Sequence, residues 1–156
     1  MTAHDPHAAE VTEFRLGSPF RPYAGRQGFR DAMASLGATA CVVTARRGDR
    51  LIGRTGTSVF SLSVDPPSVL ISIAIGSELA EAIAETYGFS FAMLAEPQRA
   101  IADAFAGRGD PEKRFDHGNW TEWPSGHTRL AGAVAAMDCG IIGTRETKKA
   151  VLFAGA

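Results

Sequence analysis

Short polar side chains gather in residues 54–77, a segment that is otherwise apolar and strand-like. Residues 55–58 read Thr-Gly-Thr-Ser, which puts small side chains and accessible backbone N–H groups on consecutive positions. Such a run suits the edge of a flat heteroaromatic ring with several hydrogen-bond acceptors. Ser77 precedes a helical pattern, where free backbone N–H groups favour a phosphate. The alternative interpretation is an edge strand with a solvated Ser/Thr face and an ordinary helix cap.

Motifs for other chemistries are missing from the sequence. It holds no G-x-S-x-G, P-loop or H-E-x-x-H pattern and no Cys/His group at zinc spacing, so we expect neither acyl transfer nor a metal site. The segment AGRGDP does not follow a strand and lacks a third glycine, so it is not a Rossmann turn. Cys41 and Cys139 lie in apolar segments and are expected to be buried, reduced thiols without a function.

The composition predicts one soluble domain. The chain has 156 residues, of which 45% are hydrophobic, so it can build a single core. A net charge of −1 with no basic block argues against nucleic-acid and membrane-surface partners. The longest apolar stretch, near residues 69–75, is far shorter than a membrane span, and the N-terminus lacks a signal-peptide pattern. We therefore expect a cytoplasmic protein.

Local patterns divide the chain into an N-terminal arm or tail (residues 1–24) and one domain (residues 25–156). Apolar residues at helical spacing in residues 29–36 predict a short amphipathic helix. Residues 40–45 and a segment from Leu51 flank a Gly-Asp turn, which predicts a hairpin.

Prolines and periodicity place the remaining elements. The Pro66-Pro67 pair lacks two N–H donors and must separate two strands. Helices are predicted after Ser77, which is a plausible N-cap, and from Pro97 to Gly107. The segment between them alternates as a half-buried strand, and two more strands are predicted near the C-terminus. The polar residues 108–132 are expected to form a functional loop.

These patterns predict a mainly β fold with α. We count about six or seven strands, joined mostly by turns, and three or four short helices. A small antiparallel barrel with helices packed outside is the natural solution.

Four segments together resemble the flavin reductase-like domain family, the short-chain reductases of two-component monooxygenases. They are FRDAMASLGATACVVTA, LIGRTGTSVFSLSVDPPSVLISIAIGS, FAMLAEPQRAIADAFAGRGDPEKRF and LAGAVAAMDCGII, and the match runs from Phe29 to Phe153. The most specific parts are the run from Thr55 to Pro67 and the Phe-Ala-Gly…Arg-Phe pair from Phe105 to Phe115.

The resemblance implies an FMN-binding split β-barrel with short flanking helices that forms a homodimer. It implies that the chain binds FMN or FAD, passes hydride to the flavin from NADH or NADPH, and supplies reduced flavin to a partner oxygenase. No protein acid or base is needed for direct hydride transfer, so no catalytic side chain is expected.

The resemblance also implies a set of flavin contacts. Residues along the ring and ribityl chain are Arg54, Thr55, Gly56, Thr57 and Ser58, those near the phosphate are Ala74, Ile75, Gly76 and Ser77, and those of a loop that closes over the flavin are Arg108, Arg114 and Phe115. Trp120 and Trp123 could cover the ring, but we favour packing beneath the loop.

The sequence departs from the family pattern at three places. Leu79 stands where many relatives have a threonine, which removes a phosphate hydroxyl. Ala150 stands where the late motif has a histidine near the nicotinamide. The sequence ends at Ala156, where relatives generally continue, so we expect a truncated barrel edge covered by another chain or by the arm. Two alternatives stay open: a flavin-binding relative without reductase activity, and a barrel for another anionic heterocycle.

Overall fold

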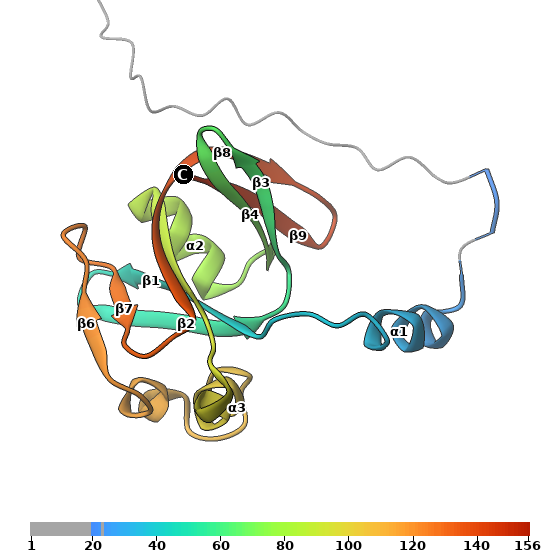
Figure 1. Ribbon diagram of the computed structural model, residues 1–156. Helices are drawn as coiled ribbons and strands as arrows, with labels where there is room; N and C mark the ends of the chain where they lie inside the picture. Colours follow the sequence, from blue (N-terminus) through green and yellow to red (C-terminus); the bar gives the residue numbers. More distant parts are fainter. Residues whose placement is uncertain (1–19, 23) are drawn as a thin grey trace, which may run out of the picture.

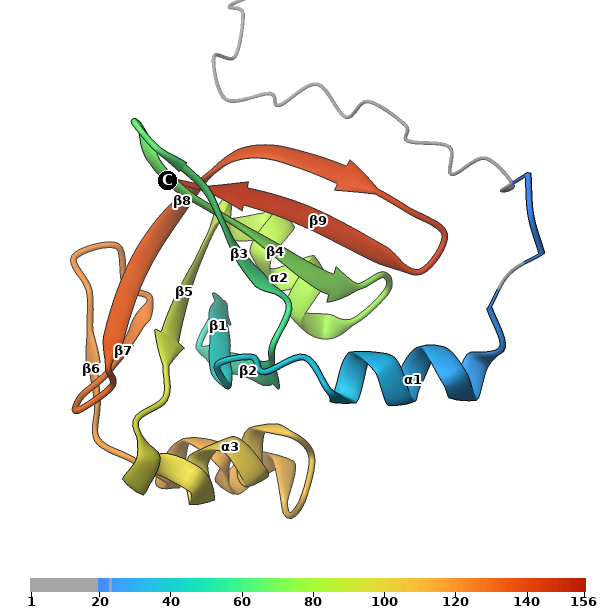
Figure 2. The same cartoon turned by 45° about the vertical axis from the view of Figure 1, so that its right-hand side comes forward.

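The computed structural model describes residues 20–22 and 24–156, and most of the predicted arm therefore lies outside the described residues. The body is one seven-stranded antiparallel sheet, with the strand order β2-β1-β5-β8-β9-β4-β3, that curls into an open barrel (Figures 1 and 2). Its strands are β1 (Cys41–Arg47), β2 (Arg50–Gly56), β3 (Val59–Val64), β4 (Pro67–Ala74), β5 (Gly88–Met93), β8 (Ala135–Glu146) and β9 (Ala150–Gly155). The predicted antiparallel barrel with short helices is confirmed.

Helices connect and cover the strands. The α-helices of the described part are α1 (Arg26–Ala34), α2 (Glu78–Thr86) and α3 (Arg99–Phe105), and the 3₁₀ helices are η1 (Glu96–Gln98) and η2 (Pro111–Asp116). Ser77 caps α2 as predicted, because its side chain accepts a hydrogen bond from the Ala80 amide. The predicted first helix is present as α1, yet it stands away from the barrel and buries none of its residues (Figure 1).

The hairpin prediction is confirmed, and the last strand lies inside the sheet, whereas the covering of a barrel edge by another chain or by the arm stays a prediction. Strands β1 and β2 pair in register around the Gly-Asp turn. The proline pair separates β3 from β4, and Pro67 opens β4 opposite Val64. The last strand, β9, pairs with β4 on one side and β8 on the other. Strand β9 is therefore an inner strand, and the edge strands of this seven-stranded sheet are β2 and β3.

Two apolar clusters fill the two sides of the sheet. The first lies between the barrel strands and α2, and includes Phe89, Phe91 and Phe153. The second lies between β1, α3 and the loop region, and includes Val42, Ala92 and Phe105. Strand β5 contributes to both, so the expectation of a half-buried strand at residues 88–94 is wrong. Its second face is buried because α3 and the following hairpin cover it.

The polar residues 108–132 are folded. Helix η2 is followed by a two-stranded sheet of β6 (Trp120–Glu122) and β7 (Thr128–Leu130). These strands have only three residues each and a polar composition, so the sequence pattern did not reveal them. They raise the strand number above the predicted six or seven.

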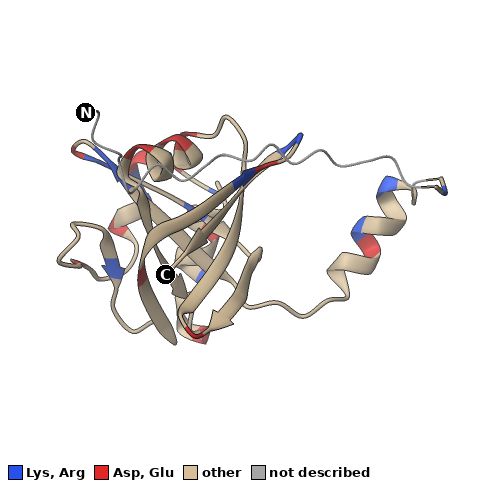
Figure 3. Ribbon diagram, turned by 90° about the horizontal axis from the view of Figure 1, so that it is seen from above, with Lys and Arg blue, Asp and Glu red and all other residues tan. Residues whose placement is uncertain are grey.

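Charged residues lie mostly on the outside of the barrel. Helix α2 carries acidic residues beside basic strand ends, as Figure 3 shows. Arg47 binds Glu81 and Glu85, and Arg50 binds Glu78, with N···O distances of 2.6–2.9 Å. These pairs fasten the helix to the β1–β2 hairpin. No helix in the described ranges is long and apolar enough to cross a membrane.

Candidate functional site

A pocket of about 360 Å³ opens where the barrel is split between the end of β2 and strand β4. The N-terminus of α2 and the C-terminus of α3 form its other sides. Its lining residues are Val43, Arg54, Thr55, Gly56, Ser58, Val59, Ser72, Ile73, Ala74, Ser77, Leu79, Phe105 and Ala106. The pocket is within the size range of small-molecule and cofactor sites.

Half of the flavin contacts implied by the sequence meet in this pocket. They are Arg54, Thr55, Gly56, Ser58, Ala74 and Ser77. These six residues come from two segments, residues 54–58 and 74–77, and the rest of the lining adds Val43 of β1 and residues 105–106 at the end of α3.

The other implied contacts lie elsewhere. Thr57 lines a groove beside α1. Ile75 and Gly76 form the turn before α2 and do not line the pocket, and Gly76 has a positive φ of 69°. Arg108 is exposed and binds Asp103. Arg114 and Phe115 line a neighbouring cavity on the far side of the α2 N-terminus.

Sequence reasoning missed the apolar wall of the pocket. Val43, Ile73, Leu79 and Phe105 supply most of this wall. Phe105 stood in the motif that carries the resemblance and could have been assigned from it. Val43 and Ile73 lie on strands, and Leu79 follows the Ser77 cap. Only the strand pairing shows which way these side chains face.

Two of the hydroxyl groups that line the pocket, those of Thr55 and Ser77, are already engaged by the protein. Ser77 Oγ donates to the Ala74 carbonyl at 2.7 Å and accepts from the Ala80 amide at 3.3 Å. Thr55 Oγ1 donates to the Ala102 carbonyl at 2.8 Å, which ties β2 to α3. The Ala80 and Glu81 amides of α2 both donate to Ser77, so the amides of Glu78 and Leu79 are the first-turn donors that suit an anion. Arg54 is the only charged residue among those that line the pocket.

Phe105 forms the back of the pocket and is fully buried. Its ring lies 5.0 Å from Phe115 and 5.5 Å from Trp120, measured between centroids. On the other side it rests on Gly53, where an added Cβ would lie 2.5 Å from Phe105 Cε1. The Phe105 ring is therefore packed between Gly53 on one side and Phe115 and Trp120 on the other. A larger residue at position 53 would clash with the ring.

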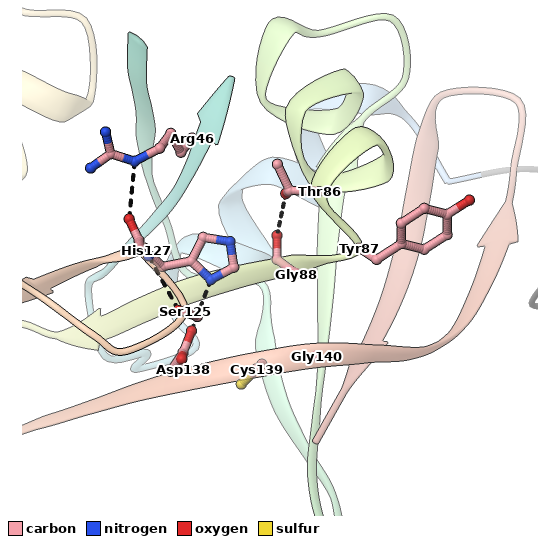
Figure 4. Close-up of a pocket in the computed structure, with 10 residues that line it drawn as sticks. Arg46, Thr86, Tyr87, Gly88, Ser125, His127, Asp138, Cys139 and Gly140 are labelled. Carbon is pink, nitrogen blue, oxygen red and sulfur yellow. Dashed lines mark hydrogen bonds and ion pairs between the residues drawn. The ribbon is translucent and has the colours of Figure 1, made fainter. Parts of the chain in front are cut away.

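The β6–β7 hairpin is anchored to the barrel by a second group of polar residues (Figure 4). His127 Nδ1 and Asp138 Oδ1 are 2.8 Å apart, and Arg46 Nε donates to the Gly126 carbonyl at 3.0 Å. The His127 ring lies over Gly88, where a Cβ would be 2.6 Å from its Cε1. These residues line a cavity of about 250 Å³ that shares no residue with the first pocket.

Both tryptophans pack against protein, as favoured from the sequence. Trp120 lies in the ring cluster with Phe105 and Phe115. Trp123 donates to Ser90 Oγ at 3.1 Å, and the Arg129 guanidinium lies 4.7 Å from its ring centroid. The hairpin thus supports the wall of the pocket from behind.

The two cysteines are free and buried, as expected. Burial raises the pKa of both thiols. For Cys139 the pKa reaches about 11, because burial is joined by the nearby Asp138 carboxylate. Neither thiol has the low pKa of a reactive cysteine.

The residues of the pocket fit the flavin that the sequence implied. An added Cβ at Gly56 would meet no atom within 4 Å, so the backbone there is open to a close ligand. The apolar wall suits a flat ring, and the first turn of α2 with Arg54 suits a phosphate.

Comparison with known proteins agrees with this geometry. The FMN reductase (NADH) RutF of Ancylobacter novellus is 34% identical over 139 residues, covering 89% of this chain and 77% of that protein. The reductase component of an FADH(2)-dependent resorcinol hydroxylase of Rhizobium is 38% identical over 115 residues, covering 72% of this chain and 64% of that protein. The crystal structure of a putative flavin reductase from Haemophilus somnus superposes with a TM-score of 0.80 at 24% identity and covers 85% of each chain, which shows the shared fold. A profile of the flavin reductase like domain matches residues 33–156, and this chain belongs to that family.

Proposed function

We propose that this chain is an NAD(P)H-dependent flavin reductase that acts on FMN or FAD. The observation that carries the proposal is the pocket at the barrel split, where small residues, an apolar wall and a helix N-terminus meet. A bound flavin would supply the redox chemistry by accepting a hydride from the nicotinamide.

The residues of the pocket bind the flavin and orient its ring. Arg54 and the first turn of α2 attract the flavin phosphate from two sides. Gly56 and Ser58 leave the backbone open at the ring edge. Ile73 and Phe105 exclude water from one face of the ring. Direct hydride transfer depends on this positioning and needs no protein acid or base.

The experiment is a titration of the purified protein with FMN and FAD, followed by NADH and NADPH. Tight flavin binding and nicotinamide oxidation faster than with free flavin support the proposal. Gly56→Leu should abolish flavin binding and leave the fold intact, because space at Gly56 is open and the larger side chain would fill the pocket. Thr121→Leu places the same leucine side chain at an exposed position of β6 and is the control. Unchanged flavin affinity in Gly56→Leu would place the ring elsewhere.

A flavin-binding protein without reductase activity is the second candidate. Ala150 pairs with Ala74, which lines the pocket, so no polar side chain stands where the family motif has a histidine. In that case NADH and NADPH would leave the bound flavin oxidised, and the absorbance of the protein would not bleach.

We propose further that the protein is a homodimer. Apolar side chains of α1, of the segment that follows it and of β3 are exposed, including Phe29 (60%), Leu36 (61%) and Phe60 (57%). With Met33 they line a groove of about 810 Å³ between α1 and the barrel. A second copy would bury both surfaces, since α1 makes no packing contact with its own barrel that buries a residue.

Light scattering tests the dimer. Phe60→Glu should give a monomer, and Ile142→Glu, at an exposed apolar position of β8, should leave the dimer intact. A monomeric wild-type protein would contradict this proposal.

The likeness to a reductase component also supports a partner oxygenase that receives reduced flavin, and with it a cytoplasmic location.

A further inference from the structure

The hydroxyl of Thr55 is bound to helix α3. Its Oγ1 donates to the Ala102 carbonyl at 2.8 Å, and the residue is half-buried. A hydroxyl has a single proton to donate, so this bond leaves Thr55 no donor for a ligand in the pocket. The acceptors at the edge of a flavin ring therefore find no partner in this side chain.

Gly53 and Thr55 face α3 together. They stand two residues apart on β2, which places them on the same face of the strand. The Phe105 ring contacts this face at Gly53, where an added Cβ would lie 2.5 Å from its Cε1. Val42, which pairs with Thr55, belongs to the same apolar cluster as Phe105. Helix α3 is thus attached to β2 at two points, by a ring contact at Gly53 and by a hydrogen bond at Thr55.

The bond from Thr55 acts on the last turn of α3. The Ala102 carbonyl also accepts from the Ala106 amide at 3.0 Å, which closes this turn. Phe105 and Ala106 lie in the same turn, and both line the pocket. Helix α3 has only seven residues and no side-chain hydrogen bond at its N-cap, so contacts from outside the helix must hold it. The place of the Phe105 ring therefore depends on the bond that Thr55 makes.

From these contacts we infer that Thr55 is a positioning residue. Its hydroxyl holds the last turn of α3 so that Phe105 lies against the flavin ring, and it does not itself bind the flavin. This role differs from the direct flavin contact that the family resemblance implied for Thr55. The inference rests on the proposed function, because the Phe105 wall affects binding only if a flavin lies against it.

Three variants isolate the hydroxyl. Thr55→Val keeps the shape of the side chain and removes the hydroxyl, whereas Thr55→Ser keeps the hydroxyl. Thr86→Val is the matched control, because Thr86 Oγ1 also donates to a helix carbonyl, that of Ala82, at 2.8 Å. Thr86 is the last residue of α2 and lies at the end of that helix away from the pocket.

Hydrogen–deuterium exchange of the flavin-free protein tests the attachment of α3. Peptides that cover residues 99–107 should exchange roughly threefold to tenfold faster in Thr55→Val, because one hydrogen bond to this segment is lost. The same peptides should exchange at the wild-type rate in Thr55→Ser and in Thr86→Val. Unchanged exchange in Thr55→Val would overturn the inference.

Flavin titration tests the consequence for binding. The dissociation constant of FMN should rise roughly threefold to tenfold in Thr55→Val and stay unchanged in the other two variants. Lumiflavin, which has the ring without the ribityl phosphate, should lose affinity by the same factor, since the wall contacts the ring.

The two measurements together separate the possible roles of Thr55. Weaker FMN binding without faster exchange would mean that the hydroxyl contacts the flavin directly. Faster exchange with unchanged FMN affinity would mean that the bond serves stability alone. Either result would overturn the inference. If the wild-type protein binds no flavin, the proposed function fails, and the exchange rates still decide whether Thr55 holds α3.

Discussion

Replacing Gly53 by alanine should destabilise the protein and weaken flavin binding together. The added Cβ would lie 2.5 Å from Phe105 Cε1 and 2.9 Å from its Cδ1. Carbon atoms pack at about 3.5–4.0 Å, so the ring must retreat by roughly 1 Å. Phe115 and Trp120 stand behind it at 5.0 and 5.5 Å between centroids, which leaves little room for this retreat.

The expected loss follows from this clash. Overpacking of a buried site costs about 1–3 kcal/mol. Replacing a glycine in a strand by alanine also raises the free energy of unfolding by roughly 0.5–1 kcal/mol, because the unfolded chain has less freedom to lose. We expect a net loss of about 1–2 kcal/mol in the free energy of unfolding, which lowers Tm by roughly 2–8 °C for a domain of this size.

The assay compares Gly53→Ala with Gly143→Ala. A Cβ at Gly143 would meet no atom closer than Ala154 Cβ at 3.9 Å, so that variant gives the effect of alanine in a strand without the clash. Thermal unfolding gives Tm, and flavin fluorescence gives the dissociation constant of FMN, which should rise in Gly53→Ala alone. Equal Tm and FMN affinity in both variants would refute the reasoning that Phe105 is wedged between Gly53 and the ring cluster.

Further predictions concern the helix cap, the hairpin anchor and the buried thiol. Ser77→Ala should cost about 0.5–2 kcal/mol of stability in denaturant unfolding and should weaken FMN more than riboflavin, because the first turn of α2 is the proposed phosphate site; equal weakening would contradict this placement. Asp138→Asn should cost about 1–3 kcal/mol, since His127 loses a charged partner, yet leave FMN affinity unchanged because the anchor lies in a separate cavity. Native protein at pH 8 should resist iodoacetamide at Cys139, whose pKa of about 11 leaves about 0.1% thiolate there, and peptide mass spectrometry should find modification only after unfolding. The unfolding free energy should also fall as the pH rises from about 9 to about 11, because the unfolded thiol loses its proton first, and Cys139→Ala should flatten that part of the profile.

Much of the fold could be predicted from local patterns. The β1–β2 hairpin, the Ser77 cap, the strand break at Pro66 and the helix after Pro97 each depend on a few adjacent residues. Turn and cap chemistry is local, so it can be read without knowing the rest of the chain. The short strands β6 and β7 could not be predicted, because three residues are too few to show a period.

The candidate site was only partly predictable, because local patterns do not show which residues packing brings into the pocket. Residues 54–58 and Ser77 belong to a recognisable run, and most of them do line the pocket. Arg114 and Phe115 come from the same family pattern, yet the path of η2 carries them into the neighbouring cavity. Sequence order gives the distance along the chain, whereas the direction in which a loop leaves a helix depends on packing.

The sequence by itself determined the β1–β2 turn, the strand break at Pro66 and the Ser77 cap of α2, and that a row of small residues precedes this helix start. Only the tertiary structure decided that Phe105 is the wall of the pocket, that β9 lies inside the sheet, and that β2 borders two separate cavities. The physical reason is that caps and turns are set by neighbouring backbone groups, whereas a wall, a sheet edge and a cavity exist only between segments that the antiparallel pairing brings together.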